Sequence, residues 1–232
     1  MSILDGKTAL ITGAKGGLGN FVTGAFLAAG AAVIGVSRSI RDSDFFHPRF
    51  SAIPAELSSG DAARRLIDAA TAGPRRLDVL VHVMGGFEGG TRVDETSDAA
   101  FERMLDLNYR AAFYLTRAIL PHMRAHAGGR ILAIASKQAT QPAPLVGAYS
   151  ASKAALVSLI RTIALENVDH GISANTVLPA TMDTPANRAA MPDADHSRWV
   201  RPADVAALLV HLASDAGAAI NGEAIGVYGS QL

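Results

Sequence analysis

The sequence predicts a single α/β domain in which a doubly wound parallel sheet of about seven strands carries helices on both faces. Short apolar segments rich in β-branched residues alternate with longer amphipathic segments along the 232 residues, as in repeated βαβ units. The short segments are apolar throughout, as strands covered on both faces are. No Pro/Gly/Ser-rich linker or shift in composition divides the chain. We therefore expect one domain, residues 1–232.

Each predicted element follows from its local pattern. The predicted strands are the apolar bursts Thr8–Thr12, Ala32–Val36, Val79–Val83, Arg130–Ala135, Ser173–Leu178 and Ala224–Tyr228. The predicted helices are the amphipathic stretches Leu18–Ala29, Ala62–Ala72, Ala99–His126, Tyr149–Val168 and Pro202–Ala213. Two irregular, proline-containing segments, Lys137–Gly147 and Asp183–Arg201, follow strands. Because an open parallel sheet binds its ligand beyond the carboxyl ends of its strands, we expect both segments at the ligand crevice.

Composition excludes several classes of function. Lys and Arg balance Asp and Glu at 21 each, so we expect neither nucleic acid nor a membrane surface as a partner. The absence of cysteine excludes disulfides, a thiolate nucleophile and a zinc site built on sulfur. His122 and His126 have metal-ligand spacing, but no carboxylate or third histidine is near in sequence, so we predict no metal. Without a secretory signal or a bilayer-length apolar run, we expect a soluble, cytoplasmic protein.

A glycine-rich turn lies between the first predicted strand and helix. It reads Thr12-Gly-Ala-Lys-Gly-Gly-Leu-Gly19. Gly13 suits a tight turn, Gly17 lets the backbone approach a pyrophosphate, and Gly19 lets the helix pack closely on the strand. The free N–H groups at the helix start favour an anion. The turn predicts a dinucleotide site that also includes Lys15, Gly16 and Leu18, although a strand-to-helix turn without a ligand also favours glycine.

The residues after the second predicted strand indicate which dinucleotide binds. An acidic residue there would bind the ribose hydroxyls of NAD and repel a 2′-phosphate. This chain has Ser37 and Arg38 instead, and a guanidinium suits a phosphate monoester. Lys15 can add a second positive charge. We therefore predict that NADP(H) is preferred over NAD(H); the alternative is that both cations are solvated surface residues.

Tyr149 and Lys153 lie four residues apart at the start of a predicted helix, which places them on one helix face. A free tyrosine has a pKa of about 10 and is a poor base near neutrality. A neighbouring ammonium favours the phenolate, so we expect Lys153 to lower the pKa of Tyr149 and make it a general acid or base. Lysine can also donate a hydrogen bond to a nicotinamide ribose.

The order of these motifs resembles the short-chain dehydrogenase/reductase family. Its TGxxxGxG turn, catalytic asparagine, serine after the fifth strand and YxxxK pair match this chain at Thr12–Gly19, Asn108, Ser136 and Tyr149–Lys153, within a resemblance from Lys7 to Tyr228. The resemblance implies a Rossmann fold in which Tyr149 exchanges the proton and Lys153 binds ribose. It implies further that Ser136 bonds the substrate oxygen and that Asn108 holds a water in the proton path. Read singly, Asn108 would be a polar helix residue and Ser136 a strand-end cap.

The resemblance also implies binding residues around the crevice. Those expected to bind the cofactor, besides the glycine turn and Ser37, Arg38, Tyr149 and Lys153, are Glu56, Leu57, Val83, Gly85, Pro179, Thr181 and Thr184. Those expected to bind the substrate are Phe87, Gln138, Tyr149, Ala180 and Met182. We expect a rather open site, because the segment between Asp183 and Trp199 forms only a short lid.

The chain departs from the family pattern at several positions. After the fourth strand the family has Asn-Asn-Ala-Gly, whereas this chain has His82-Val-Met-Gly85; we interpret His82 as a structural substitute for the first asparagine. Ala180 replaces a common glycine. The glycine-rich run Gly85–Gly90 resembles a loop of dihydropteridine reductases, and its Phe87 either stacks on an aromatic substrate or caps the sheet edge. Trp199 is expected to anchor its segment to the core.

These inferences predict an NADP(H)-dependent oxidoreductase for a small carbonyl or alcohol substrate. One alternative is a dihydropteridine reductase-like enzyme for a quinonoid or pterin substrate, which Ser136 disfavours. Another is a non-catalytic module that senses the dinucleotide, which the complete set of four catalytic positions disfavours. By family analogy we expect a homotetramer or homodimer assembled through the long helices.

Overall fold

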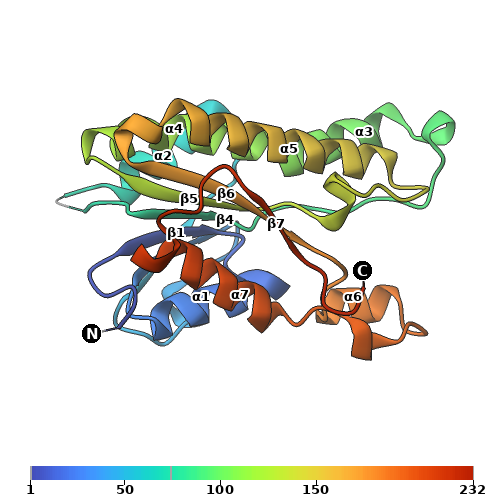
Figure 1. Ribbon diagram of the computed structural model, residues 1–232, viewed down its shortest axis with the longest axis horizontal. Coiled ribbons are helices and arrows are strands. Elements are labelled where there is room, and N and C mark those ends of the chain that lie inside the picture. The colour runs from blue at the N-terminus through green and yellow to red at the C-terminus, as the bar shows by residue number, and fades with distance from the viewer. Residues whose placement is uncertain (1, 74, 232) are drawn as a thin grey trace.

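The chain folds into three layers, with one sheet between two layers of helices (Figure 1). The computed structural model describes residues 2–73 and 75–231. All seven strands are parallel, in the order β3-β2-β1-β4-β5-β6-β7. Their bounds are β1 Thr8–Thr12, β2 Ala32–Ser37, β3 Phe50–Pro54, β4 Val79–His82, β5 Gly129–Ile134, β6 Ile172–Pro179 and β7 Ala224–Val227. The predicted fold class is therefore confirmed.

The helices divide between the two faces of the sheet. One face is covered by α2 (Gly60–Ala70), α4 (Ala111–Ala125) and α5 (Gly147–Glu166), with α3 (Asp98–Leu105) packed on α5. The other face is covered by α1 (Gly17–Ala28) and α7 (Pro202–Ala213), which pack on each other. The short helix α6 (Pro185–Ala190) projects beyond the sheet (Figure 1). Within residues 2–73 and 75–231, no helix has the length and apolar character needed to cross a membrane.

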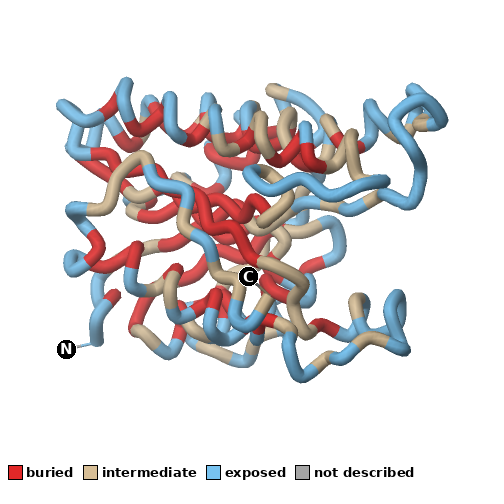
Figure 2. Tube along the Cα trace, turned by 45° about the vertical axis from the view of Figure 1, so that its right-hand side comes forward, coloured by how far each residue is buried: buried red, intermediate tan, exposed pale blue. Residues whose placement is uncertain are grey.

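Alternating side chains of each strand feed two separate apolar cores. Leu10 and Leu80 face α4 and α5, whereas Ile11 and Val81 face α1 and α7. Because both faces are buried, the strands lack the polar alternation of a half-exposed sheet. The buried residues accordingly run along the centre of the molecule on both sides of the sheet (Figure 2).

The strand order reverses between β1 and β4. The chain proceeds from β1 outward through β2 to β3, then returns to place β4 on the other side of β1. Thr12 and His82, the last residues of β1 and β4, are register partners. The loops that leave them diverge in opposite directions, and such a switch point is where doubly wound sheets bind ligands.

Three elements differ from the sequence-based prediction. Helix α6 lies within the segment Asp183–Arg201, which was expected to be irregular. The edge strand β3 was not predicted, because its five residues include Ser51 and Pro54 and only Phe50 among them is buried. The predicted helix 99–126 is interrupted by a π-helical segment, Asp106–Arg110, between α3 and α4. The wider π turn changes the direction of its side chains, and it carries Asn108 at a fully buried position.

Candidate active site

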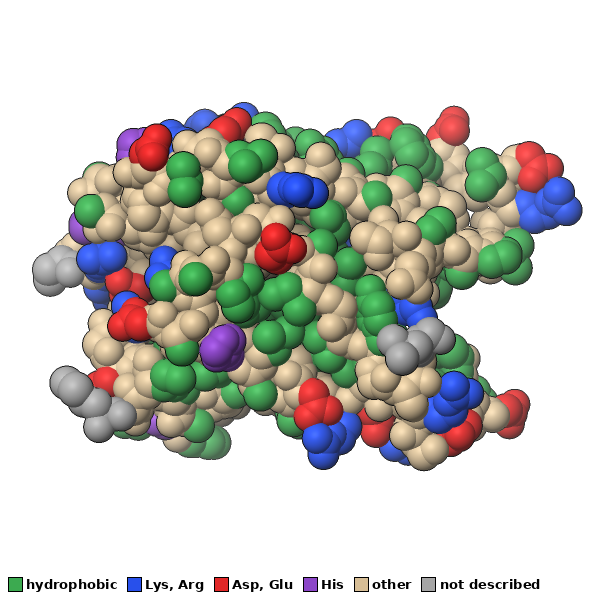
Figure 3. All heavy atoms as spheres, in the orientation of Figure 1, with side chains coloured by type: hydrophobic (Ala, Val, Ile, Leu, Met, Phe, Trp, Pro, Cys, Tyr) green, Lys and Arg blue, Asp and Glu red, His purple; other side chains and the backbone are tan. Residues whose placement is uncertain are grey.

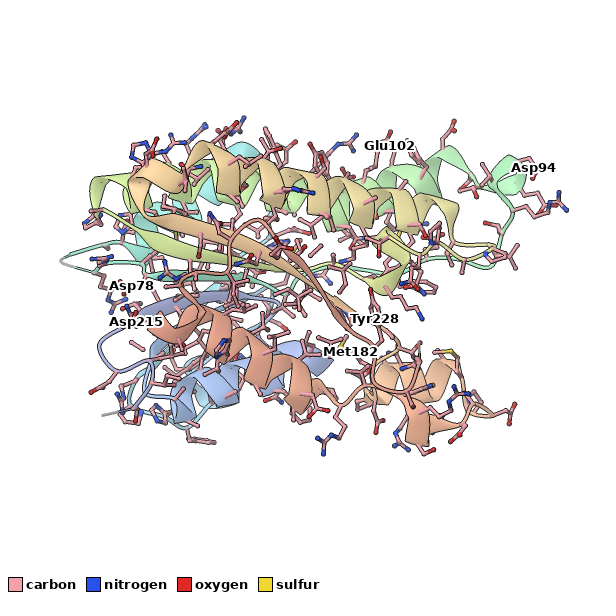
Figure 4. All side chains as sticks on the ribbon, in the orientation of Figure 1. Asp78, Asp94, Glu102, Met182, Asp215 and Tyr228 are labelled. Atoms are coloured by element: carbon pink, nitrogen blue, oxygen red, sulfur yellow. The ribbon has the colours of Figure 1, made fainter. Side chains whose placement is uncertain are left out.

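A crevice of about 1570 Å³ runs along the carboxyl ends of the strands. One wall is formed by the turns after β1, β2, β3 and β4, and the far end is enclosed by α3, the start of α5 and α6. Figure 3 shows the molecule hollowed between the part that carries α3 and the part that carries α6. In Figure 4, Met182 marks the sheet side of this hollow and Glu102 the helical layer above it. The volume exceeds the roughly 300–1000 Å³ of ordinary ligand pockets, so it has room for a dinucleotide and a second small molecule.

The glycine turn has the conformation that a phosphate cradle requires. Gly13 has φ +67°, and a Cβ there would lie 3.0 Å from the Met84 nitrogen. A Cβ on Gly19 would lie 1.9 Å from the Gly13 carbonyl oxygen. The N-cap of α1 is Gly16, and no side chain caps the helix. The backbone N–H groups at this end of the helix therefore have no side-chain hydrogen-bond acceptor, which fits an anionic group.

Residues at the ends of β2 and β3 form the outer part of the crevice. Ser37, Arg38, Glu56 and Leu57 all line it. Arg38 is exposed, and no described residue accepts a hydrogen bond from its guanidinium or forms an ion pair with it. The Lys15 ammonium instead lies 3.0 Å from the Asp44 carboxylate. Arg38 is thus the cation at this end that is available to a ligand phosphate.

Lys153 lies one helical turn after Tyr149 on α5 and is only 4% exposed. Its Nζ donates a 2.9 Å hydrogen bond to the carbonyl oxygen of Ile134, at the end of β5. Burial disfavours the ammonium and lowers the pKa of Lys153 to about 8. The site therefore contains a lysine that loses its charge far more readily than a surface lysine.

Tyr149 differs from the sequence-based expectation. Its pKa is raised by burial, and the Ser136 hydroxyl opposes that effect in part. The expectation that Lys153 lowers the pKa of Tyr149 is not met, because the ammonium is directed to the Ile134 carbonyl oxygen. The phenol is consequently protonated at neutral pH. Its ring packs edge-on against Phe87, with 4.9 Å between the ring centroids.

Ser136 and Gln138 form a polar pair beside Tyr149. Ser136 is buried at the end of β5, donates a hydrogen bond to Gln138 Oε1 and accepts one from the Gln138 backbone N–H. Both residues line the crevice. Ser136 therefore acts as a cap, as the alternative interpretation held, and also lies where it could reach a substrate oxygen.

The Asn108 carboxamide is fully engaged by the protein. Its Oδ1 accepts from the Gly86 N–H at 2.9 Å, and its Nδ2 donates to the Gly86 carbonyl at 3.0 Å and to Ser152 Oγ at 3.1 Å. It lies behind the crevice lining. Asn108 is thus a positioning residue for the loop after β4, and its role in a water-mediated proton path stays a prediction.

His82 holds the start of the same loop. Its Nδ1 shares a 3.0 Å hydrogen bond with Thr12 Oγ1, which also accepts from the Met84 N–H at 3.3 Å. Burial, aided by the charge of Lys153, lowers the pKa of His82 to about 3, so the ring is neutral. This pairing supports the interpretation of His82 as a structural substitute for asparagine.

The segment after β6 divides into lining and supporting residues. Pro179, Ala180, Thr181 and Met182 line the crevice, as predicted. Thr184 does not; its hydroxyl caps α6 by accepting from the Asn187 N–H at 3.3 Å. A Cβ on Gly17 would lie 3.2 Å from the Thr184 side chain. Thr184 therefore supports the glycine turn in this structure, and its contact with a nicotinamide stays a prediction.

Several lining residues escaped the sequence analysis. Asn187, Ala190 and Met191 of the α6 region line the crevice; the predicted lid contained them without singling them out. Residues of α3 and the π segment also contribute, but their charged side chains resemble a solvent-facing surface in sequence. Trp199 packs on His196 with 4.3 Å between ring centroids and does not line the crevice.

The histidines on α4 have structural contacts. His122 Nε2 accepts a hydrogen bond from the Leu77 N–H at 3.1 Å, and His126 Nδ1 lies 2.8 Å from the His122 carbonyl oxygen. Across the part of the chain that the structure describes, no three His, Asp or Glu side chains gather around a common metal position.

The chain matches known proteins over most of its length. Residues 7–195 match the family model for short chain dehydrogenases. A 2-dehydro-3-deoxy-D-gluconate 5-dehydrogenase of Pseudoalteromonas atlantica is 31% identical, covering 94% of this chain and 93% of that protein. A galactitol 2-dehydrogenase of Rhizobium johnstonii is 33% identical, covering 97% and 94%.

Solved structures agree with the sequence relatives. A protein from Beutenbergia cavernae that is named as a putative NAD(P)-dependent gluconate 5-dehydrogenase, with NADP bound at low occupancy, superposes with a TM-score of 0.90 at 31% identity, covering 98% of this chain and 97% of the other. A 3-ketoacyl-(acyl-carrier-protein) reductase from Brucella melitensis complexed with NADH has a TM-score of 0.89 at 27% identity, covering 99% and 100%.

Replacing Gly85 by alanine tests the close packing behind the crevice. A Cβ there would lie 2.8 Å from Asn108 Oδ1 and 3.0 Å from Lys153 Nζ. We expect Gly85→Ala to lower the free energy of unfolding by about 1–3 kcal/mol, as overpacking does. Gly24→Ala is the matched control, because a Cβ there meets nothing within 4 Å on an exposed helix position. Urea denaturation of both variants checks this; equal stability would contradict it.

The lowered pKa of Lys153 predicts a pH-dependent stability. The unfolded lysine, with a pKa of about 10.4, binds a proton that the folded state releases above pH 8. Below pH 8 the buried ammonium of Lys153 therefore lowers the free energy of unfolding by its full amount. This destabilisation decreases as the pH rises toward 10. We expect the wild type to gain about 2 kcal/mol relative to Lys153→Met between pH 7.5 and 9.5. Denaturation curves at both pH values measure the difference; a pH-independent difference would show that Lys153 titrates normally.

Proposed function

Because the chain belongs to the short-chain dehydrogenase family, we propose that it is an NADP(H)-dependent oxidoreductase that interconverts a small carbonyl compound and its alcohol. The observation that carries the proposal is the placement of Tyr149, Ser136 and Lys153 in the same crevice as the glycine turn. The relatives' names describe dehydrogenation of hydroxyl groups or reduction of keto groups. The alternative of a non-catalytic sensing module loses support, because the relatives of this chain are named as enzymes.

Tyr149 is the proton-transferring group. When bound, the nicotinamide supplies or accepts the hydride. The Tyr149 phenol donates its proton to the carbonyl oxygen in reduction and takes one from the hydroxyl in oxidation. Its raised pKa keeps the proton in place at neutral pH, which favours its action as the acid of a reductase. For oxidation the phenolate must be stabilised, and an ammonium that turns from Ile134 toward Tyr149 would do so.

Ser136 and Lys153 orient the reacting groups. The Ser136 hydroxyl, now bonded to Gln138, can donate to the substrate oxygen from the end of β5. Lys153 reaches the crevice beneath the loop after β4 and has hydrogen-bond donors left for a ribose hydroxyl. Pro179 at the end of β6 and Thr181 just after it line the same crevice. The buried Asn108 fixes the loop that forms the floor between these groups.

The preference for NADP(H) rests on Arg38. It is exposed at the end of β2 beside Ser37, where a ribose 2′-phosphate would lie in this fold. Lys15 adds positive charge across the glycine turn, although Asp44 neutralises part of it. The solved relatives include one with NADP and one with NADH, so the preference rests on this chain's own residues.

The protein assembles as a homotetramer or homodimer through the outer layer of α4 and α5. Phe113 on α4 and Leu165 on α5 are both large apolar side chains left exposed on these helices. Burial of such side chains between subunits would remove apolar surface from water.

Replacing Tyr149 by phenylalanine tests its role directly. The ring and its packing on Phe87 are kept, whereas the proton donor is lost. We expect kcat to fall by roughly 10²–10⁴-fold, the usual contribution of a general acid or base. The dissociation constant for NADPH, measured by fluorescence titration, should stay within a few-fold. Unchanged turnover would rule out the assigned role.

Replacing Arg38 by alanine tests the cofactor preference. We expect a 10- to 100-fold weaker Kd for NADPH with little change for NADH, because a charge-assisted hydrogen bond contributes about 1.5–3 kcal/mol. Arg65→Ala is the control, since Arg65 is exposed on α2 and does not line the crevice. Titration of both cofactors against both variants measures the effect. If NADPH and NADH weaken equally, the 2′-phosphate is not bound by Arg38.

A further inference from the structure

We propose that the substrate is an uncharged carbonyl compound carrying a flat apolar group, such as an aromatic ring, which lies on Phe87 beside Tyr149. This inference rests on the proposed function and specifies its substrate class. Phe87 lines the crevice and is 67% exposed. Its ring centroid is 4.9 Å from that of Tyr149, with the planes at 75°. An aromatic surface therefore lies open to the crevice directly beside the proton-transferring group.

The loop that carries Phe87 is rigidly anchored despite its glycines. Asn108 holds both the N–H and the carbonyl group of Gly86. On the other side, the Glu88 carboxylate accepts two hydrogen bonds from Arg103 of α3, at 2.7 and 2.9 Å. The residues on either side of Phe87 in the sequence, Gly86 and Glu88, are thus both held in place by hydrogen bonds. A binding surface that is ordered before the ligand arrives avoids the entropic cost of ordering on binding.

The glycines of this loop allow neighbouring residues to pack closely against its backbone. A Cβ on Gly86 would lie 2.7 Å from Leu107, and one on Gly89 would lie 2.9 Å from Val146 and 3.1 Å from the Phe87 ring. The Gly90 N–H donates at 2.8 Å to the Leu145 carbonyl of the segment before α5. The loop therefore packs against both the π segment Asp106–Arg110 and the segment that leads to Tyr149.

The other walls of this half of the crevice are largely apolar. Val146, Met182, Ala190 and Met191 line it. Besides the hydroxyls of Ser136, Tyr149 and Thr181, the uncharged polar groups here are two amides: Gln138, bonded to Ser136, and Asn187, whose Nδ2 donates to the Met182 carbonyl at 2.8 Å. Apolar walls with a few fixed polar groups are typical of sites for uncharged organic ligands.

The charged side chains at this end already have partners. Arg103 is paired with Glu88, and Arg110 lies 2.6 Å from both Glu102 and Asp106. Lys153 donates to Ile134. Among the described lining residues, no cation in this half is left for a substrate carboxylate, whereas the two lining carboxylates, Glu102 and Asp106, would repel one. An anionic substrate would have to break an ion pair or remain unpaired, and either costs binding energy.

Matched substrates test separately the effects of the substrate's charge and of its aromatic ring. Methyl benzoylformate and benzoylformate share one aromatic ketone and differ in charge; methyl pyruvate keeps the ester but lacks the ring. With NADPH, we expect kcat/KM for methyl benzoylformate to exceed that for benzoylformate by about 100-fold, as for an unpaired charge. It should exceed that for methyl pyruvate by about 10-fold. A preference for the anion, or equal rates for the two esters, overturns the inference.

Variants of Phe87 test whether this residue causes the preference for the aromatic ester. Phe87→Ala should lower kcat/KM for methyl benzoylformate about 10-fold more than for methyl pyruvate, because only the first substrate uses the ring. Phe46→Ala is the matched control, since Phe46 is 96% exposed and does not line the crevice. Equal losses on both esters in Phe87→Ala would show that Phe87 supports Tyr149 rather than the substrate, and would overturn the inference.

A binding measurement separates this inference from the proposed function. If no carbonyl compound is reduced with NADPH or NADH, the proposed function fails. Calorimetry with NADPH then compares methyl mandelate with mandelate, whose hydroxyl groups NADPH cannot reduce. Binding of the ester alone, lost in Phe87→Ala and kept in Phe46→Ala, supports the substrate class. Tighter binding of the anion, no binding of either, or no effect of Phe87→Ala overturns it.

Discussion

The buried carboxamide of Asn108 is the interaction on which the geometry of the crevice depends. From the π segment between α3 and α4, it bonds the backbone of Gly86 on one side and Ser152 of α5 on the other. It thereby joins three separate elements: the loop after the central strand β4, the helix that carries Tyr149 and Lys153, and the helical wall of the crevice. A polar group buried without partners would be costly, so satisfying all its hydrogen bonds confines these elements to one arrangement.

Burial at this junction opposes charge on every titratable group nearby. It lowers the pKa of Lys153 and of His82 and raises that of Tyr149. The site therefore combines a neutral imidazole, a protonated phenol and an ammonium that loses its proton easily. In the proposed reaction, hydride transfer to a carbonyl leaves an oxygen that must acquire a proton, and the protonated phenol beside Ser136 would supply it. Burial disfavours the charged form of Lys153, and it also strengthens the hydrogen bonds that Lys153 makes, because the local dielectric constant is low.

The two halves of the crevice are lined by different kinds of residues. The cofactor half is made of glycine, exposed helix N–H groups and an available guanidinium, all suited to phosphate. The substrate half is made of apolar side chains, an aromatic surface and cations already neutralised by carboxylates. Tyr149 and Lys153 lie where the halves meet. Such a division lets one fold keep a common chemistry while the substrate half changes from protein to protein.

The sequence by itself determined the fold class, six of the seven strands, the glycine turn and the Tyr149–Lys153 pair, because apolar periodicity and short spacings are local properties that survive without coordinates. It did not reveal the edge strand Phe50–Pro54, the helix α6, the clamp of Asn108 on Gly86 or the packing of Phe87 on Tyr149. It also led to the wrong direction for the pKa of Tyr149, since helical spacing brings Lys153 to the same face but does not show that its ammonium bonds Ile134. These features depend on contacts between residues far apart in the chain and on burial, and both arise only when the elements pack.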